Sequence, residues 1–139
     1  MDSSDTSDKA NRSKHKIVVL RTAIKEAKAF LQNGGAYLHV VQIVRRLVHF
    51  GDPEELWDLR IKPIEDFHEL CLKGNMLGKT NCRIYFKFLP ERGEILILKA
   101  YKKDEEGKTP RFIVINLEDR LSDYLAGRLK EKILVYRSL

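Results

Sequence analysis

The chain has 139 residues, of which 43% are hydrophobic, and a formal net charge of +6. This length fits one domain with one compact core, and two cysteines, Cys71 and Cys82, are too few for a disulfide framework. The apolar run near the start, Ile17 to Leu20, is too short for a signal peptide or a membrane span, so a soluble, cytoplasmic protein is expected.

The N-terminal part is predicted to be a disordered tail over residues 1–15, because it mixes Ser, Asp, Lys and Asn without an apolar period. A single domain is expected over 16–139. A short first strand is predicted from Lys16 to Leu20, where four apolar residues follow one lysine.

Two helices are predicted next. Thr22 is a candidate cap for a helix over residues 23–32, which the run from Asn33 to Gly35 ends. The second helix, residues 36–49, has the clearest helical period of the chain. Its outer face is expected to be a solvated helix surface rather than a partner-binding one.

A short helical turn is predicted over residues 54–59, because Asp52 and Pro53 form a capping pair. Trp57 in this turn is expected to anchor core packing. A strand follows over Phe67 to Lys73, and residues 74–81 are predicted to be a loop.

The stretch from Cys82 to Lys103 has the pattern of a β-hairpin. Polar and apolar residues alternate from Arg83 to Phe88, a second apolar run covers Ile95 to Leu98, and Pro90 to Gly93 supplies the turn. If the two strands pair, one end of the sheet carries a cationic surface with aromatic rings, which suits RNA phosphates and bases.

A C-terminal helix is predicted over residues 110–126, and 128–139 is left open between strand and helix. The expected fold class is therefore α+β. A small twisted antiparallel sheet, connected as a meander, has the two N-terminal helices and the C-terminal helix packed on it.

Charge is concentrated on the hairpin and its flanks, since residues 73–111 contain ten basic and five acidic side chains. Such an excess points to an acidic partner such as nucleic acid, although a solvated basic face is an equally good interpretation. No metal or cofactor is expected, because the four histidines show no metal-ligand spacing. His68 is interpreted as a core histidine and Cys71 as a small buried residue.

The segment from Gly74 to Thr80 is similar to a phosphate-binding loop, but three residues rather than four separate its glycines. A true loop of this kind leads into a helix, whereas a strand is predicted here. We therefore reject nucleotide binding by this loop.

From Ile17 to Leu125 the chain resembles the RelE/ParE toxin superfamily, especially its phage-derived branch near HigB. The residues that carry the resemblance are Lys16 to Leu20 before a helix, Phe67 to Leu70, Arg83 to Phe86, and Tyr101 to Lys103 followed by Lys108 to Pro110. The resemblance implies a RelE-like toxin domain, neutralised by a cognate antitoxin protein. It further implies a metal-independent endoribonuclease that cleaves mRNA on the ribosome.

The resemblance also implies roles for individual residues. Arg83 matches the family's catalytic arginine and would stabilise the transition state. Lys103, with Lys102, would hold phosphate or assist proton transfer, and Tyr101 would stack on a base. The remaining residues assigned to RNA binding are Lys73, Lys79, Tyr85, Lys87 and Lys108.

The general base stays unassigned, because Glu69 and Cys71 stand where the family has basic residues and no tyrosine lies between Lys103 and Pro110. Glu69 and Lys99 are the two candidates for this role. The alternative is a non-catalytic relative, either an RNA-binding module or a gyrase-type inhibitor.

Overall fold

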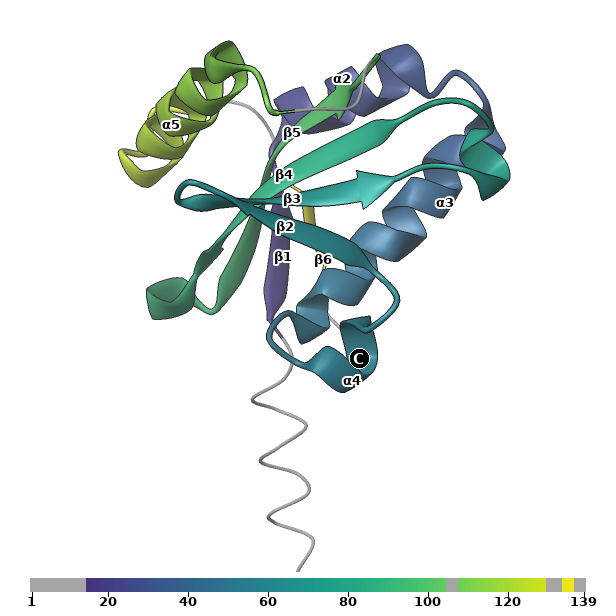
Figure 1. The fold of residues 1–139 in the computed structure, drawn as a ribbon. Coiled ribbons are helices and arrows are strands. Elements are labelled where there is room, and N and C mark those ends of the chain that lie inside the picture. The colour runs from purple at the N-terminus through teal and green to yellow at the C-terminus, as the bar shows by residue number, and fades with distance from the viewer. Residues whose placement is uncertain (1–14, 105–107, 130–133, 137–139) are drawn as a thin grey trace, which may run out of the picture.

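The computed structural model describes residues 15–104, 108–129 and 134–136 (Figure 1). Its strands are β1 (Lys16–Val19), β2 (Arg60–Ile64), β3 (Phe67–Leu72), β4 (Cys82–Leu89), β5 (Glu94–Lys102) and β6 (Leu134–Tyr136). Its helices are α2 (Arg21–Phe30), α3 (Gly34–Arg45), α4 (Pro53–Leu56) and α5 (Arg111–Leu125). The predicted α+β class is confirmed.

The strands of the described residues form one sheet in the order β2-β3-β4-β5-β1-β6. The expected antiparallel meander covers β2 to β5. The prediction of a purely antiparallel sheet is wrong, because β1 pairs in parallel with β5. The crossover through α2 and α3 makes this pairing possible, since it carries the chain away from β1 before the meander begins.

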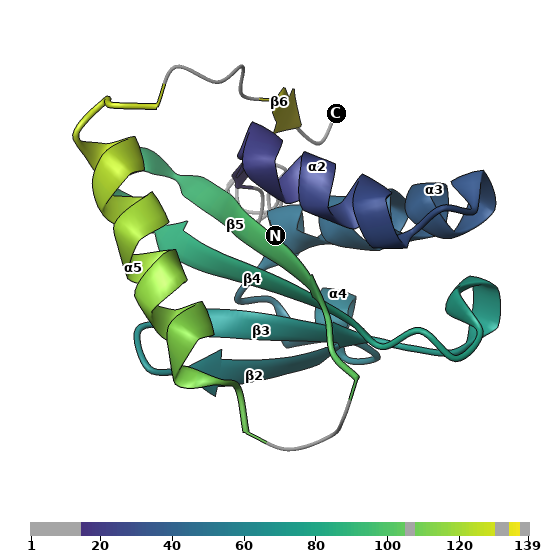
Figure 2. The same ribbon diagram turned by 90° about the horizontal axis from the view of Figure 1, so that it is seen from above.

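The two faces of the sheet carry separate cores. Ile84, Phe86 and Ile97 point to the face that α2 and α3 cover, whereas Leu96 and Leu98 point to the face that α5 covers. Figure 2 shows α5 lying across the strands on its own side of the sheet. Because both faces are covered, even Glu69 of β3 and Arg83 of β4 are buried.

The two N-terminal helices begin earlier than predicted. α2 starts at Arg21 behind Leu20, whose side chain makes no capping hydrogen bond, so Thr22 lies inside the first turn and is not the cap. Asn33 does not end the first helix but caps the second, since its Oδ1 accepts a 2.8 Å hydrogen bond from the Gly35 N–H. After α3, a 3₁₀ turn continues over Arg46–His49.

The region between α3 and β3 differs most from the prediction. Asp52 caps α4 as expected, but Trp57 is 81% exposed, so it does not anchor the core. Sequence reasoning missed β2, which lies at the edge of the sheet. Pro63 is tolerated there because an edge strand needs hydrogen bonds on one side only.

Most of the predicted tail, residues 1–14, lies outside the described residues. His15, the last residue assigned to it, belongs to the fold. Its N–H donates to Val48 O over 2.6 Å and its ring packs on Phe88. At the other end, residues 134–136 form a strand that pairs with β1. In the part of the chain that the structure describes, none of the helices has the length and apolar character needed to cross a membrane.

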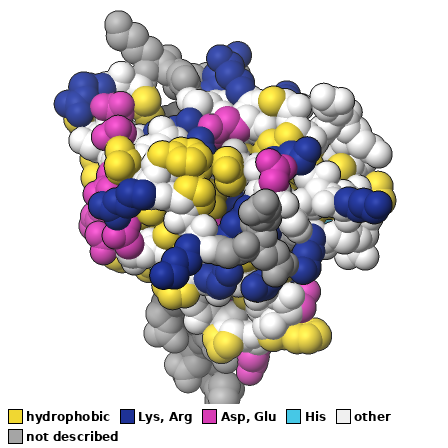
Figure 3. Space-filling view, turned by 45° about the horizontal axis from the view of Figure 1, so that its top comes forward, with side chains coloured by type: hydrophobic (Ala, Val, Ile, Leu, Met, Phe, Trp, Pro, Cys, Tyr) yellow, Lys and Arg dark blue, Asp and Glu magenta, His cyan; other side chains and the backbone are white. Residues whose placement is uncertain are grey.

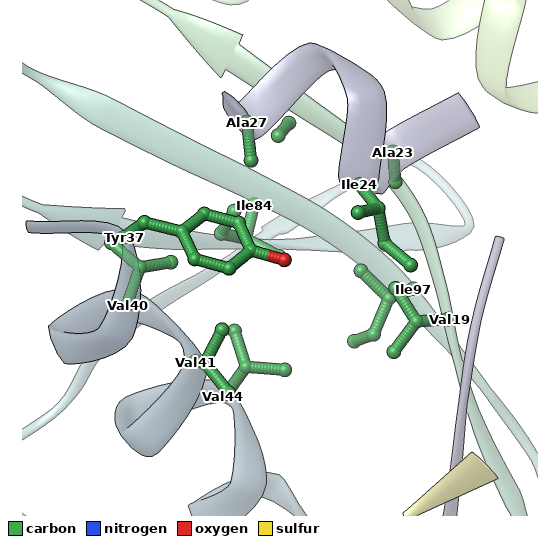
Figure 4. Close-up of a pocket in the computed structure, with 11 residues that line it drawn as sticks. Val19, Ala23, Ile24, Ala27, Tyr37, Val40, Val41, Val44, Ile84 and Ile97 are labelled. Carbon is green, nitrogen blue, oxygen red and sulfur yellow. The ribbon is translucent and has the colours of Figure 1, made fainter. Parts of the chain in front are cut away.

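A small apolar pocket lies between α2, α3 and the sheet (Figure 4). Ala23 and Ile24 of α2, Val40 and Val44 of α3, and Ile97 of β5 contribute to its walls. The lining is almost entirely hydrocarbon, so this pocket offers no polar group for chemistry apart from the ring hydroxyl of Tyr37. The chemistry-bearing side chains lie on the opposite face of the sheet.

Candidate active site

Two neighbouring rows of side chains cross the α5 face of the sheet. In the first row Arg60, Cys71, Arg83 and Tyr101 stand opposite one another on β2 to β5. The second row contains Lys62, Glu69, Tyr85 and Lys99. Side chains that stand directly opposite each other share a face and lie within contact distance. The rows therefore gather ionisable groups from strands that are far apart in sequence.

Glu69 is the centre of this group and is only 1% exposed. Its carboxylate accepts hydrogen bonds from Tyr85 Oη at 2.7 Å, Thr109 Oγ1 at 3.0 Å and Cys71 Sγ at 3.4 Å. Burial by itself raises the pKa of Glu69, but the hydrogen bonds from Tyr85 and Thr109 bring it below its ordinary value. Glu69 is therefore ionised and a weak base.

Two cations lie beside the same oxygen of this carboxylate. Arg83 Nε and Lys62 Nζ are each 3.8 Å from Glu69 Oε1. Arg83 is 2% exposed, and among the described residues its buried Nε has no hydrogen-bond acceptor. Lys103, 7% exposed, also contributes to the low pKa of Glu69 through its charge. An anion that accepted a hydrogen bond from Arg83 would complete this arrangement.

Two members of the group are held in their protonated forms. Burial, followed by the hydrogen bond to Glu69, raises the pKa of Tyr85 well above its usual range. Burial and the charge of Glu69 raise the pKa of the Cys71 thiol, so Cys71 is a poor nucleophile, as expected for a small buried residue. Tyr85 is 0% exposed. The predicted contact of Tyr85 with RNA is therefore wrong for this conformation, because its ring is inaccessible.

Lys99 stands opposite Tyr85 but belongs to a different network. Its Nζ lies 2.7 Å from Glu26 Oε2 of α2. Arg120 of α5 binds both oxygens of the same carboxylate at 2.8 Å and donates to Leu98 O. Lys99 thus helps to join α2, β5 and α5, and nothing in its contacts favours it as a general base.

The predicted RNA-binding lysines fall into two groups. Lys73, Lys79 and Lys108 are exposed; Lys73 directly follows β3, Lys79 lies three residues before β4, and Lys108 lies three residues before α5. Figure 3 shows Lys and Arg side chains gathered beside an apolar area on one face of the molecule.

Lys87 and Lys102 do not join the site. Lys87 lies four residues along β4 from Arg83, about 13 Å away, and donates to Asp66 O. Lys102 stands opposite Cys82, whose side chain packs into the core on the α2 and α3 face of the sheet.

Sequence reasoning missed four residues of this face. Arg60 and Lys62 were overlooked because β2 was not predicted, although the alternation Arg60-Ile61-Lys62 was a signal for it. Thr109 was not assigned to the site, but its hydroxyl donates a 3.0 Å hydrogen bond to Glu69 Oε2. Phe112, in the first turn of α5, is 59% exposed and contacts the ring of Tyr101.

The remaining candidates for chemistry lie apart from this site. His68 is half-buried and stacks on Phe86, with ring centroids 5.4 Å apart, which fits a packing role. Its buried Nδ1 has no hydrogen-bond partner among the described residues, so the interpretation as a hydrogen-bonded core histidine is not confirmed. Within residues 15–104, 108–129 and 134–136, no three His, Cys, Asp or Glu side chains come together as a metal site would require.

The chain was also compared with known proteins. No family model matches it, and no curated protein sequence matches it.

Proposed function

We propose that this protein is the toxin of a type II toxin-antitoxin system, a metal-independent endoribonuclease with a RelE-like arrangement that cleaves mRNA on the ribosome. The order of elements supports this proposal, since a first strand and two helices precede a meander and a helix on its other face. The observation that carries it is the position of Arg83, whose buried Nε lies 3.8 Å from Glu69 Oε1 and has no hydrogen-bond acceptor among the residues that the structure describes. A phosphate oxygen is the kind of acceptor that a guanidinium binds best.

In the proposed reaction the ribose 2′-oxygen attacks the neighbouring phosphorus atom. The bond from phosphorus to the 5′-oxygen then breaks, which yields a 2′,3′-cyclic phosphate and a 5′-hydroxyl. One proton leaves the 2′-hydroxyl and one is returned to the 5′-oxygen. Arg83 and Lys103 stabilise the extra negative charge on the phosphorane oxygens.

Glu69 suits a positioning role better than that of general base. Its pKa lies below the ordinary value and its oxygens accept hydrogen bonds from Tyr85 and Thr109. A carboxylate that is held in this way keeps the neighbouring Arg83 in place. The contacts of Lys99 do not favour it either, so the base of the proposed reaction is left unassigned.

Access to Arg83 is part of the proposal. At 2% exposure, the Arg83 side chain meets a phosphate only after the groups that cover it move. Thr109, two residues before α5, is hydrogen-bonded to Glu69, the carboxylate beside Arg83, and we infer that it is one such group. We therefore expect RNA binding to separate Thr109 from Glu69.

Inducible expression followed by mapping of mRNA 5′ ends tests this function. Expression of the wild type is expected to arrest growth and create new 5′ ends, and Arg83→Ala is expected to abolish both. Arg128→Ala, which changes an exposed arginine paired with Asp123, is the matched control and should behave as the wild type. Thermal unfolding of the purified variants separates loss of activity from loss of fold.

A non-catalytic binding protein is the second candidate, and the burial of Arg83 and Glu69 favours it. On this alternative the charged group has a structural role, and the exposed lysines alone contact RNA or another acidic partner. RNA affinity that falls with salt, together with intact mRNA after expression, would support this alternative and contradict the nuclease.

A further inference from the structure

We propose that Phe112, together with Tyr101, forms a stacking platform for an RNA base next to the phosphate that Arg83 would contact. This inference rests on the proposed action on RNA. It adds Phe112, which no sequence motif indicated, to the base-stacking role that the resemblance implies for Tyr101.

Phe112 is exposed in a place where the fold does not need an aromatic side chain. It lies in the first turn of α5 and is 59% exposed, whereas its neighbour Ile113 is fully buried against the sheet. Its ring meets that of Tyr101 edge to face, with centroids 6.2 Å apart and planes inclined by 77°. In this geometry the two rings hold each other in place, and the exposed Phe112 ring offers a flat aromatic surface on which a base can stack.

The platform lies next to the candidate active site. Tyr101 on β5 stands opposite Arg83 on β4, so the two side chains are neighbours on one face of the sheet. Arg83, Tyr101 and Phe112 therefore lead from a buried guanidinium, through a half-buried ring, to an exposed one. A nucleotide stacked at the exposed end would place its neighbour close to Arg83.

The charges around the platform favour nucleic acid as its occupant. Arg60 and Lys62 share this face of the sheet, and Lys108 is exposed just before α5. Arg111 beside Phe112 is paired at 2.9 Å with Glu65 and so contributes less. Cations around an exposed aromatic ring are typical of sites for single-stranded nucleic acid, in which phosphates and a base are held together.

The platform also predicts a preference among RNA sequences. A site that binds by stacking accepts every base, but its preference follows stacking strength rather than hydrogen bonding. Purines present the larger ring surface. We therefore expect RNA that carries adenine at the platform to bind more tightly than RNA that carries uracil there.

Binding of 2′-O-methyl RNA oligonucleotides, which lack the attacking hydroxyl, tests the platform without cleavage. The affinities of adenine-rich and uracil-rich single strands are measured by fluorescence anisotropy. Phe112→Ala is expected to weaken binding of the adenine-rich strand by about 5- to 100-fold. Phe112→Tyr should keep the wild-type affinity. Leu125→Ala, which removes another exposed apolar side chain of α5, is the matched control and should change nothing.

A second measurement does not depend on how well Phe112→Ala folds. Trp57 is the single tryptophan of the chain and is 81% exposed. In a Trp57→Phe background, Phe112→Trp places the fluorophore at the platform, and adding the adenine-rich strand is expected to quench its emission.

The outcomes separate this inference from the proposed function. Failure of the wild type to bind either RNA would overturn the platform, whereas the proposed cleavage on the ribosome is overturned only if expression creates no new mRNA 5′ ends. Binding by the wild type, with unchanged affinity in Phe112→Ala or no quenching at position 112, would overturn the platform alone. That result would assign the exposed ring to contact with a protein instead.

Discussion

Glu69 and Tyr85 stand opposite each other on β3 and β4, and the Tyr85 hydroxyl donates a 2.7 Å hydrogen bond to Glu69 Oε2. Both side chains are buried, at 1% and 0% exposure. A carboxylate in this position costs free energy unless each oxygen is hydrogen-bonded, so the surrounding donors are a condition for the fold as well as parts of a site.

Tyr85→Phe is expected to destabilise the protein by about 1.5–3 kcal/mol, because it removes one hydrogen bond to a charged acceptor. Glu69→Gln should cost more, about 3–5 kcal/mol, since it leaves Arg83 buried without a negative partner. Urea unfolding, monitored by circular dichroism, measures the stability of both variants. Equal stability of the two variants would contradict the central position of Glu69.

Acidification is expected to weaken the fold through His68. Burial, followed by the charge of Lys87, lowers the pKa of His68 below its ordinary value. The unfolded chain then binds a proton more readily than the folded protein does. Keeping His68 neutral therefore contributes to folding stability above about pH 6.5, and this contribution is lost as the pH falls through the lowered pKa of His68.

The variant His68→Phe tests this prediction, because a phenyl ring fits between Phe50 and Phe86 without titrating. Between pH 7 and pH 5.5, the free energy of unfolding should fall less in His68→Phe than in the wild type. His39→Gln, on α3 and outside this aromatic cluster, serves as the control. An identical decline in wild type and His68→Phe would show that another group is responsible.

Removing the contact between Glu26 and Arg120 is expected to loosen α5. Both side chains are partly buried, at 24% and 16% exposure, and two hydrogen bonds of 2.8 Å join them. A double-mutant cycle with Glu26→Ala and Arg120→Ala should give a coupling energy of about 0.5–3 kcal/mol. Additive effects of the two substitutions would contradict a direct contribution of this pair.

Leu117→Ala is expected to cost about 2–5 kcal/mol, because Leu117 is 0% exposed between α5 and the sheet and its loss leaves a cavity. Leu125→Ala, on the same helix but 45% exposed, should change stability by less than about 0.5 kcal/mol. Thermal unfolding of both variants checks whether the α5 face contributes a core of its own.

Local patterns predicted the strands β3, β4 and β5 and the helix α5, because alternation and helical period are local signals. They did not predict the parallel partner of β1, since a short apolar strand does not specify its neighbour. β2 was not predicted, because the strand has only five residues and Pro63 interrupts its alternation.

The candidate site was predicted only in part for a related reason. The alternation from Arg83 to Phe88 was interpreted as a strand with one buried and one solvent-exposed face, and Arg83 and Tyr85 were placed on the exposed face. The structure covers both faces, so these polar side chains lie inside. The contact of Thr109 with Glu69 joins residues 40 positions apart, and a sequence pattern carries no signal for such a contact.

The Glu26 network has one more consequence. Beyond its pairing with β1, strand β5 would present free backbone groups at Leu98 and Ala100, but Arg120 donates to Leu98 O and Glu26 accepts from the Ala100 N–H. Two side chains thus occupy positions at which another polypeptide could add a strand. Replacing Glu26 would remove the acceptor of the Ala100 N–H and the carboxylate that holds Arg120 in place, so both backbone groups of β5 would need other partners.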